Sequence, residues 1–256
     1  MIRYDGIPLT GVSASIGILD IQEKPPTIQT VTASRTKADG LRRLYKKKTV
    51  RIIAVEFDIF EQDQALRREI FNSILLWADG KEDKWLALDY NGSKHLVATC
   101  TKYPEYSAKD PSKSLKMEFT SYDPYWSADQ PTTLTFSTSA NTRYTGSMIV
   151  GGSAKTCPLS FEITNTGTVA MTSVNVTAGS TSITLSGISL AVGSKLELGY
   201  SDDGLMFARI GTTSVLDKRT DASDDDLILN QRAVNAVTVL TSTKASVKLM
   251  ARGLSL

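Results

Sequence analysis

The chain has 256 residues, with 29 Lys and Arg against 27 Asp and Glu. This length suits one large β domain or two ordinary domains, and it allows a core that folds without metal or disulfide. The near balance of charge argues against a general nucleic-acid binder, and no apolar run approaches the roughly 20 residues of a membrane span. The N-terminal residues lack a signal-peptide pattern, which predicts a soluble protein made in the cytoplasm.

A basic segment precedes the first clear strand. Residues 35–51 contain eight Lys and Arg residues and one acidic residue, Asp39. Such a run is typical of a patch that binds phosphate or an acidic protein surface. It is also typical of a solvated hairpin whose edge strand is protected by lysines, which is the more common case.

The residues that follow predict one strand and one helix. Residues 52–59 alternate as a strand with one buried face does, and residues 62–79 change to helical spacing. Gly80 stands where a C-cap glycine belongs. The buried strand face is Ile53, Val55, Phe57 and Ile59. The apolar stripe of the helix is Leu66, Ile70, Ile74 and Trp77 with Phe71 beside them, and Arg67, Arg68 and Glu69 are expected to point outward.

Three more strands are expected at 84–90, 94–100 and 114–120, with Asn91-Gly92 as a hairpin turn between the first two. The last strand should end before Pro124, because proline donates no ladder hydrogen bond and keeps its predecessor extended. Aromatic residues are concentrated at this strand end, which reads Tyr122, Asp123, Pro124, Tyr125 and Trp126.

The second half of the chain has a different composition. Five of the nineteen aromatic residues lie beyond Pro131, where Ser, Thr, Val, Leu and Gly dominate. Short strands separated by turn residues predict an antiparallel β-sandwich there, with part of 130–158 as a connector or edge strand. The predicted fold is mainly β with two domains. A β-sandwich-like domain at 1–132 carries the one α-helix, and a C-terminal sandwich spans 133–256.

Residue types that often carry catalysis are few. His95 is the single histidine, it begins a predicted strand, and no nucleophile motif accompanies it. Cys100 and Cys157 match no metal spacing, so buried free thiols are expected, with a disulfide as the alternative. The sequence therefore predicts no enzyme, no cofactor and no metal site.

Two other groups were candidates for binding. Residues 221–226 contain four aspartates but lack the glycine and distal glutamate of an EF-hand loop, which favours a solvated loop over a calcium site. Trp77 and Trp85 are expected in the core, which leaves Trp126 as the tryptophan whose exposure the sequence does not decide. The second half holds no tryptophan, which argues against a carbohydrate-binding sandwich.

The order of these segments resembles that of a known family. A proline-interrupted N-terminal arm leads to the basic hairpin, then to "VRIIAVEFDIF", one helix and "WLALDYNGSKHLVATC". The segment "MEFTSYDPYW" and an all-β domain ending "NAVTVLTSTKASVKLMARG" follow. In this order the chain resembles the distal tail protein (Dit) family of siphophages, the phages with long non-contractile tails. The "F-x-x-x-DPYW" end and the "N-A-V-T-V" strand are its most telling pieces.

The resemblance implies a structural virion protein at the tail tip. It implies a homo-hexameric ring, formed through the N-terminal domain, that joins the tail-tube protein to the tail-tip or baseplate proteins. A receptor-binding protein is a further candidate partner. The resemblance also implies that the C-terminal sandwich is galectin-like and projects outward. Phage DNA would pass through the ring without sequence-specific recognition, and no membrane is involved.

Two sets of residues then become candidate sites. Lys46, Lys47, Lys48 and Arg51 are candidate assembly contacts with a neighbouring subunit or an acidic tube ring. Tyr122, Asp123, Pro124, Tyr125 and Trp126 are the candidate seat on which the second domain rests. Tyr and Trp suit a seat because they combine an apolar body with a polar tip. Closure of the first core is the simpler interpretation of the same residues.

The alternatives come from other classes of protein. The main one is a two-domain adhesin of the tail tip whose sandwich binds host-surface carbohydrate. A tail-tube protein ranks lower, because such proteins lack so long a helix-bearing domain joined to a separate sandwich. A wall hydrolase ranks last, because the sequence shows no pairing of base and nucleophile.

Overall fold

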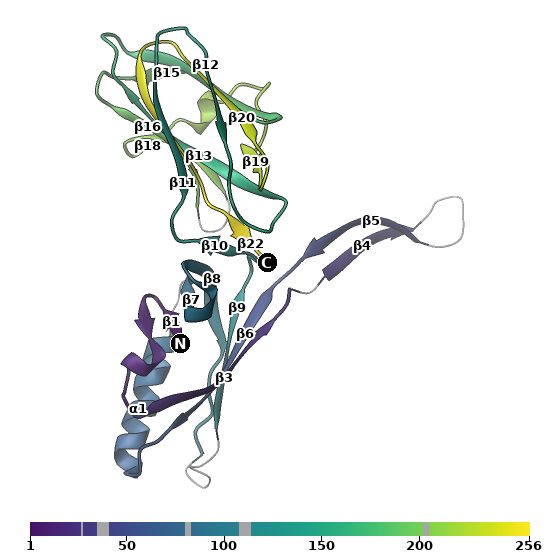
Figure 1. Ribbon diagram of the computed structural model, residues 1–256, viewed down its shortest axis with the longest axis vertical. Helices are drawn as coiled ribbons and strands as arrows, with labels where there is room; N and C mark the ends of the chain where they lie inside the picture. The colour runs from purple at the N-terminus through teal and green to yellow at the C-terminus, as the bar shows by residue number, and fades with distance from the viewer. Residues whose placement is uncertain (27, 35–40, 80–82, 108–113, 202–204) are drawn as a thin grey trace. The chain divides into compact units, whose positions relative to one another are not determined.

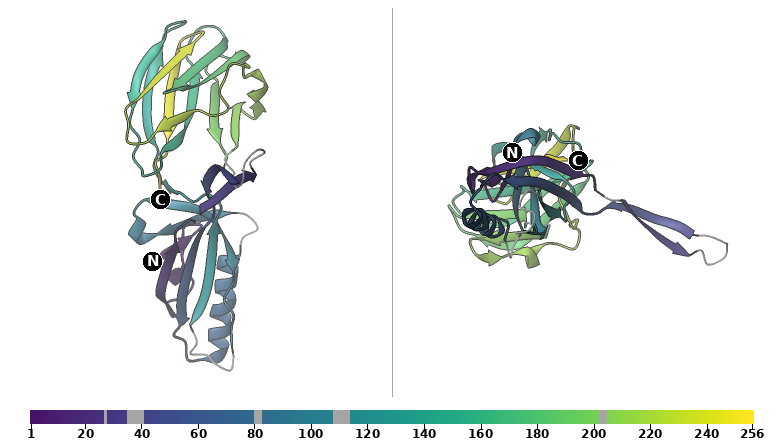
Figure 2. Two further views of the ribbon diagram at one scale, coloured as in Figure 1. Left: turned by 90° about the vertical axis from the view of Figure 1, so that its right-hand side faces the viewer. Right: turned by 90° about the horizontal axis from the view of Figure 1, so that it is seen from below.

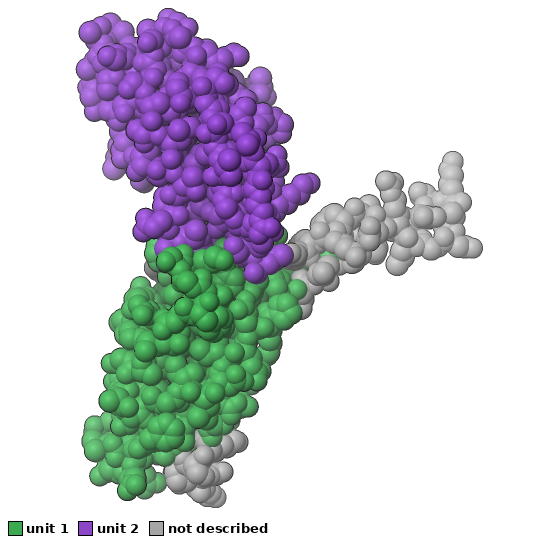
Figure 3. Space-filling view, in the orientation of Figure 1, with its two compact units in different colours: residues 1–126 green, residues 127–256 purple. Residues whose placement is uncertain are grey.

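The computed structural model of the chain describes residues 1–26, 28–34, 41–79, 83–107, 114–201 and 205–256, with the backbone alone at 28, 30–34 and 41–48. Most of these residues lie in antiparallel strands, and among them there is one α-helix, α1 (Gln64–Ala78) (Figure 1). The predicted mainly β fold class is confirmed. The chain divides into two compact units, residues 1–126 and 127–256 (Figure 3), where the sequence suggested a boundary at 132.

Unit 1 consists of an antiparallel sheet and helix α1, which lies along one face of the sheet (Figure 2). The strand order is β2-β1-β7-β8-β9-β6-β3, so β2 and β3 lie at its two ends. The strands are β1 (Ile2–Tyr4), β2 (Ile7–Pro8), β3 (Ile16–Lys24), β6 (Arg51–Ile59), β7 (Lys84–Leu88), β8 (Lys94–Lys102) and β9 (Leu115–Ser121). Two 3-10 turns are η1 (Leu9–Gly11) and η2 (Asp89–Asn91). Gly92, which follows η2, has a φ of 65°, and this positive angle suits the glycine of the turn predicted between β7 and β8.

The core of unit 1 follows from strand alternation. The predicted buried face of β6 is confirmed, because its four apolar residues are at most 1% exposed. They form one cluster with the buried residues of α1, which are Phe71, Ile74 and Ala78. Burying a side chain as large as that of Phe71 or Ile74 stabilises a fold by about 1.5–3 kcal/mol. The helix therefore serves as the second layer of the unit.

Helix α1 departs from the predicted stripe at two positions. Leu66 is 49% exposed, because it lies about 80° around the helix axis from Ile74, the centre of the buried face. Arg67, which was expected to point outward, turns inward and places Nη2 3.1 Å from Asp58 Oδ1 on β6. The Asp58 carboxylate on β6 attracts the guanidinium. The C-cap residue predicted at Gly80 lies outside the described residues.

Strand β7 corrects the expectation that Trp85 belongs to the core. Leu86 and Leu88 of β7 are fully buried, so alternation sends Trp85 to the opposite face of the sheet, where it is 48% exposed. Its ring stacks on His95, with 4.0 Å between ring centroids. Within the part of the chain that the structure describes, no helix has the length and apolar character to traverse a bilayer.

A hairpin is inserted between β3 and β6. Its strands, β4 (Ile28–Ser34) and β5 (Leu41–Lys48), form a two-stranded ladder of their own and pair with no other described strand. Strands β3 and β6 pair directly with each other, from Ile16 opposite Ile59 to Lys24 opposite Ile52. The hairpin therefore starts where this pairing ends.

Unit 2 is a sandwich of two antiparallel sheets that face each other (Figure 2). One sheet has the order β11-β21-β13-β16-β17-β18, with β19 paired to β13, and the other has the order β12-β20-β14-β15. Strand β10 (Trp126–Ala128) leads into the unit, and one 3-10 turn is η3 (Leu216–Lys218). The strands are β11 (Thr132–Thr138), β12 (Tyr144–Met148), β13 (Thr156–Asn165), β14 (Met171–Ala178), β15 (Thr181–Leu190), β16 (Lys195–Tyr200), β17 (Met206–Ile210), β18 (Thr213–Ser214), β19 (Ile228–Asn230), β20 (Asn235–Thr241), β21 (Ala245–Ala251) and β22 (Leu254–Ser255).

The segment 130–158 supplies edge strands to both sheets of unit 2. β11 lies at the end of one sheet and pairs with β21, and β12 lies at the end of the other and pairs with β20. The expectation of an edge strand in this segment is confirmed. Apolar residues of both sheets meet in the core, for example Phe161 on β13 and Val176 on β14.

Candidate functional site at the root of the hairpin

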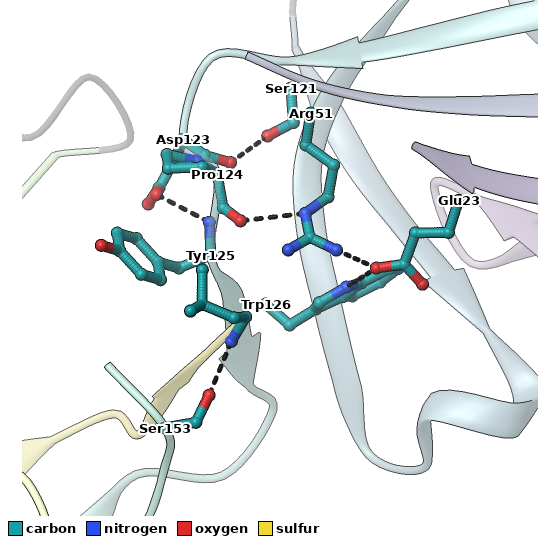
Figure 4. A network of polar contacts seen from close by, with 9 residues as sticks. Glu23, Arg51, Ser121, Asp123, Pro124, Tyr125, Trp126 and Ser153 are labelled. Carbon is teal, nitrogen blue, oxygen red and sulfur yellow. Dashed lines mark hydrogen bonds and ion pairs between the residues drawn. The ribbon is translucent and has the colours of Figure 1, made fainter. Parts of the chain in front are cut away.

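The strands that carry the hairpin meet the end of unit 1 in one polar cluster (Figure 4). Glu23 is the next-to-last residue of β3, Arg51 is the first residue of β6, and residues 121–126 follow along the chain from β9. β6 lies between β3 and β9 in the sheet, and Arg51 is opposite Ser121 in the ladder. Strand register therefore brings the hairpin root and the exit from unit 1 together.

Arg51 is the centre of this cluster. Its side chain is 3% exposed, its Nε donates to the Pro124 carbonyl at 2.9 Å, and its Nη1 donates to Glu23 Oε1 as an ion pair. The guanidinium carbon lies 5.9 Å from the centroid of the Trp126 ring. Burial lowers the pKa of the Arg51 guanidinium, and the carboxylate beside it compensates the buried charge.

Trp126 closes the cluster and also belongs to the core of unit 1. It is 2% exposed, and its Nε1 donates to Glu23 Oε1 at 2.8 Å. One carboxylate oxygen thus accepts from both Trp126 and Arg51. A buried indole N–H normally needs such a partner. Glu23 therefore holds both the strand after the hairpin and the residue at the end of unit 1.

The loop between β9 and Trp126 is held by its own polar groups. β9 ends at Ser121, before Pro124, as the sequence predicted. The Ser121 Oγ donates to the Asp123 carbonyl at 2.6 Å, and the Tyr125 N–H donates to Asp123 Oδ1 at 3.1 Å. Desolvation raises the pKa of Asp123, and the Tyr125 N–H opposes that shift. The backbone course into Trp126 is therefore fixed locally.

The structure gives different outcomes for the two predicted sets of site residues. Arg51 is buried and bonded within unit 1, so it is not an exposed assembly contact, and we assign it to the architecture of its own unit. The side chains of Lys46, Lys47 and Lys48 lie outside those that the structure describes, and their assembly role stays a proposal. Of the candidate seat, Pro124 and Trp126 are buried and Tyr122 is 69% exposed. The role of residues 122–126 as a seat stays a prediction.

Sequence reasoning missed Glu23. A weak signal was present, because Glu23 shares strand phase with the inward-facing Ile21 and would place a carboxylate on the core side of β3. The basic residue at the start of β6 was its natural partner. The basic run hid this pairing, because it suggested that Arg51 shared the environment of the lysines.

The other chemical candidates take structural positions. Cys100 and Cys157 are buried free thiols, as expected, and burial raises the pKa of each to about 11. Asp224 Oδ2 accepts from the Ser182 N–H at 2.6 Å, and Asp225 pairs with Arg219 at 3.3 Å. Over the described ranges, no three His, Cys, Asp or Glu side chains gather to hold a metal ion.

Comparison with known proteins gives a structural likeness. No family model and no curated protein matches the chain. The SPP1 Dit (gp 19.1) protein, described as a paradigm of the hub adsorption apparatus in phages that infect Gram-positive hosts, matches with a TM-score of 0.70 at 10% identity over 98% of both chains. A chain of the phage P2 baseplate, in its activated conformation with Ca, matches with a TM-score of 0.50 at 10% identity over 93% of this chain and 90% of that one. The chain therefore has the fold of a Dit protein.

Proposed function

We propose that the protein is a structural component of a phage virion, a distal tail hub. In this proposal six copies form a ring that joins the last ring of tail-tube protein to the tail-tip or baseplate proteins, and unit 1 makes the ring. Unit 2 decorates the ring as a galectin-like sandwich that faces outward. A receptor-binding protein is a further candidate partner. The work of such a hub is repeated protein contact, which requires no catalytic group.

The extent of the fold match carries the proposal. A sandwich alone is shared by many unrelated proteins, because a fold by itself does not fix function. Here the likeness to the SPP1 hub protein covers 98% of each chain, so it includes the helix-bearing sheet, the sandwich and their order. The second match is to a chain of a phage baseplate, so both of these neighbours are phage proteins.

The hairpin supports contact with another protein chain. A two-stranded hairpin is at best marginally stable in water without a third strand or a packing surface. β4 and β5 pair with each other and with no other described strand. A neighbouring subunit or the acidic face of a tail-tube ring would supply the missing surface, and the basic sequence of 41–48 suits an acidic partner.

The proposal is tested by the mass and shape of the purified full-length chain. Light scattering should give six times 27.8 kDa for the chain alone, or six copies plus the bound partner when the tail-tube protein of the same phage is added, and negative-stain images should show six-fold annuli. A monomer under both conditions contradicts the proposal. The adhesin alternative predicts binding on a glycan array of the whole chain, whereas a hub is expected to be silent there.

A further inference from the structure

The sandwich of unit 2 protects the edge strands on one of its two open sides. There the edge strands are β15 and β18, and η3 contacts both β15 and β17. The Thr220 N–H donates to the Thr184 carbonyl at 3.0 Å, and the Asp224 N–H donates to the Ser182 carbonyl at 2.8 Å, so residues 219–224 cover the edge of β15. β18 is two residues long. Covering and short length are two ways in which proteins prevent an edge strand from pairing with another chain.

The other open side of the sandwich lacks this protection. Its edge strands are β11 and β12, and each pairs with one described strand, β21 and β20 respectively. Neither strand contains a charged residue or a proline. The ladder of β11 runs from Thr132 opposite Ala251 to Thr138 opposite Ala245 without a bulge, and the ladder of β12 is also unbroken. Lysines, prolines and bulges are the usual means of blocking an exposed edge, and both strands lack them.

The side chains of β11 suit an added strand. Phe136 on β11 stacks on Tyr144 of β12, with 3.5 Å between ring centroids and 9° between ring planes, which joins the two edges across the sandwich. Leu134 and Phe136 pack against the core but stay partly exposed. On the opposite face of the strand, Thr133 and Thr135 are exposed. A strand placed beyond β11 would therefore cover apolar side chains on one face and meet hydroxyl groups on the other.

We infer that β11 accepts an additional strand from a different protein chain. An antiparallel edge strand directs the N–H and C=O groups of every second residue away from its sheet, and another backbone matches that spacing. The segment that fits is extended and free of proline. Every second side chain is apolar, to cover Leu134 and Phe136, and those between are polar and uncharged. A charged side chain would lose hydration there and find no opposite charge on β11.

The proposed ring determines which chain supplies the strand, so this step rests on the proposed function. Antiparallel pairing of β11 with the same strand of a second copy requires a two-fold axis. Neighbours in the proposed ring are related by a six-fold rotation instead. Unit 1 carries the ring and the proposed contact with the tail tube, whereas β11 belongs to unit 2. A tail-tip or baseplate protein is therefore the partner that fits.

Hydrogen–deuterium exchange tests whether the edge of β11 is covered in the virion. The measurement compares the purified full-length chain with the same chain in isolated phage tails. In the purified chain, the amides of β11 that point away from β21 should exchange rapidly. In the tails, their exchange should slow by about tenfold or more, because the added strand accepts their hydrogen bonds. β15 is the internal control, since residues 219–224 already cover its edge and its exchange should not change.

A pair of double variants tests the partner directly. Thr133→Lys with Ser137→Lys places two charges on β11 at exposed positions that lie opposite Met250 and Ser246. Thr212→Lys with Thr213→Lys, also exposed and next to β18, is the matched control. Circular dichroism, thermal unfolding and ring mass should match the wild type in both. The tail-tip and baseplate proteins of the same phage are expressed one at a time and tested for binding. One of them should bind the β11 variant about tenfold or more weakly than the control.

The outcomes separate this inference from the proposed hub. If β11 exchanges as fast in tails as in the purified chain, or no tail-tip or baseplate protein distinguishes the two double variants, the edge is free and the inference is wrong, while the hub stands. If β11 is already protected in the purified ring, another copy of this chain covers it and the assigned partner is wrong. If the chain is absent from isolated tails, both the hub and the added strand are overturned.

Discussion

At the scale of single residues, the ion pair between Arg51 and Glu23 combines burial with specificity. A guanidinium that is 3% exposed loses most of its hydration, and its two acceptors recover part of that loss. The ion pair does more than stabilise the sheet locally. It fixes the start of β6 against the loop that leads out of unit 1.

The substitution Glu23→Gln tests this pair. Glutamine retains an acceptor for Trp126 but removes the counter-charge of Arg51, and Glu23 is 26% exposed, which lessens the loss. We expect unit 1 to lose about 1–3 kcal/mol of unfolding free energy. Urea unfolding followed by tryptophan fluorescence measures this unit selectively, because all three tryptophans lie within residues 1–126. Lys24→Met, which removes the exposed Lys24–Glu118 pair, should cost less than about 1 kcal/mol. Equal losses from both substitutions would contradict the assignment.

The two buried cysteines should make the folding stability of the chain depend on pH in the alkaline range. Burial raises the pKa of Cys100 and Cys157 to about 11 in the folded chain, from an ordinary value near 9. The folded state therefore holds these protons more tightly, and its stability should fall as pH rises from about 9 to 11, by on the order of 2 kcal/mol per thiol. At pH 8 a disulfide reagent should label neither thiol within minutes in buffer and both in urea. Rapid labelling of the native protein would show that the thiols are accessible.

At the scale of elements, the errors in the sequence interpretation have physical causes. The periods of β6 and α1 were readable because each element has one buried face, and the strand end before Pro124 followed from backbone chemistry. Sequence period predicts burial less well for residues on the flank of a helix or on the outer face of a strand. Leu66 and Trp85 are apolar in sequence, yet both lie away from the core because neighbours at better positions fill it.

The basic strand of the hairpin leads to a prediction about ring assembly. Reversing the charge of Lys46, Lys47 and Lys48 to glutamate should weaken ring assembly at least tenfold, because the proposed partner surface is acidic and like charges repel. The comparison is a triple reversal of Lys155, Lys244 and Lys248, which are exposed in unit 2 and should leave assembly unchanged. Sedimentation at two salt concentrations measures both effects, and the difference should shrink at high salt. Unchanged assembly of the first triple variant would remove the lysines from the interface.

At the scale of the whole molecule, strand patterns and composition indicated a mainly β chain, the resemblance in segment order implied the Dit fold, and the structure has that fold. The network at the hairpin root was harder to predict, because it joins residues as far apart as Glu23 and Trp126. Turn and period signals act over a few residues, whereas this contact depends on the register of three strands. Arg51 was placed with the lysines for the same reason, since a sequence run does not show where a side chain points.

The division into two units predicts the behaviour of a shortened chain. Each unit has its own apolar cluster, and the cluster of unit 1 ends with Trp126. A chain of residues 1–132 retains that cluster and the hairpin, so it should fold and, if the proposed ring is made by unit 1, form annuli by itself. Tryptophan fluorescence reports whether the fragment is folded, and electron microscopy reports its assembly. A folded fragment that stays monomeric, where the full chain forms rings, would show that unit 2 takes part in closure. The ring would then belong to the whole chain, and the role of unit 2 as a decoration would have to be abandoned.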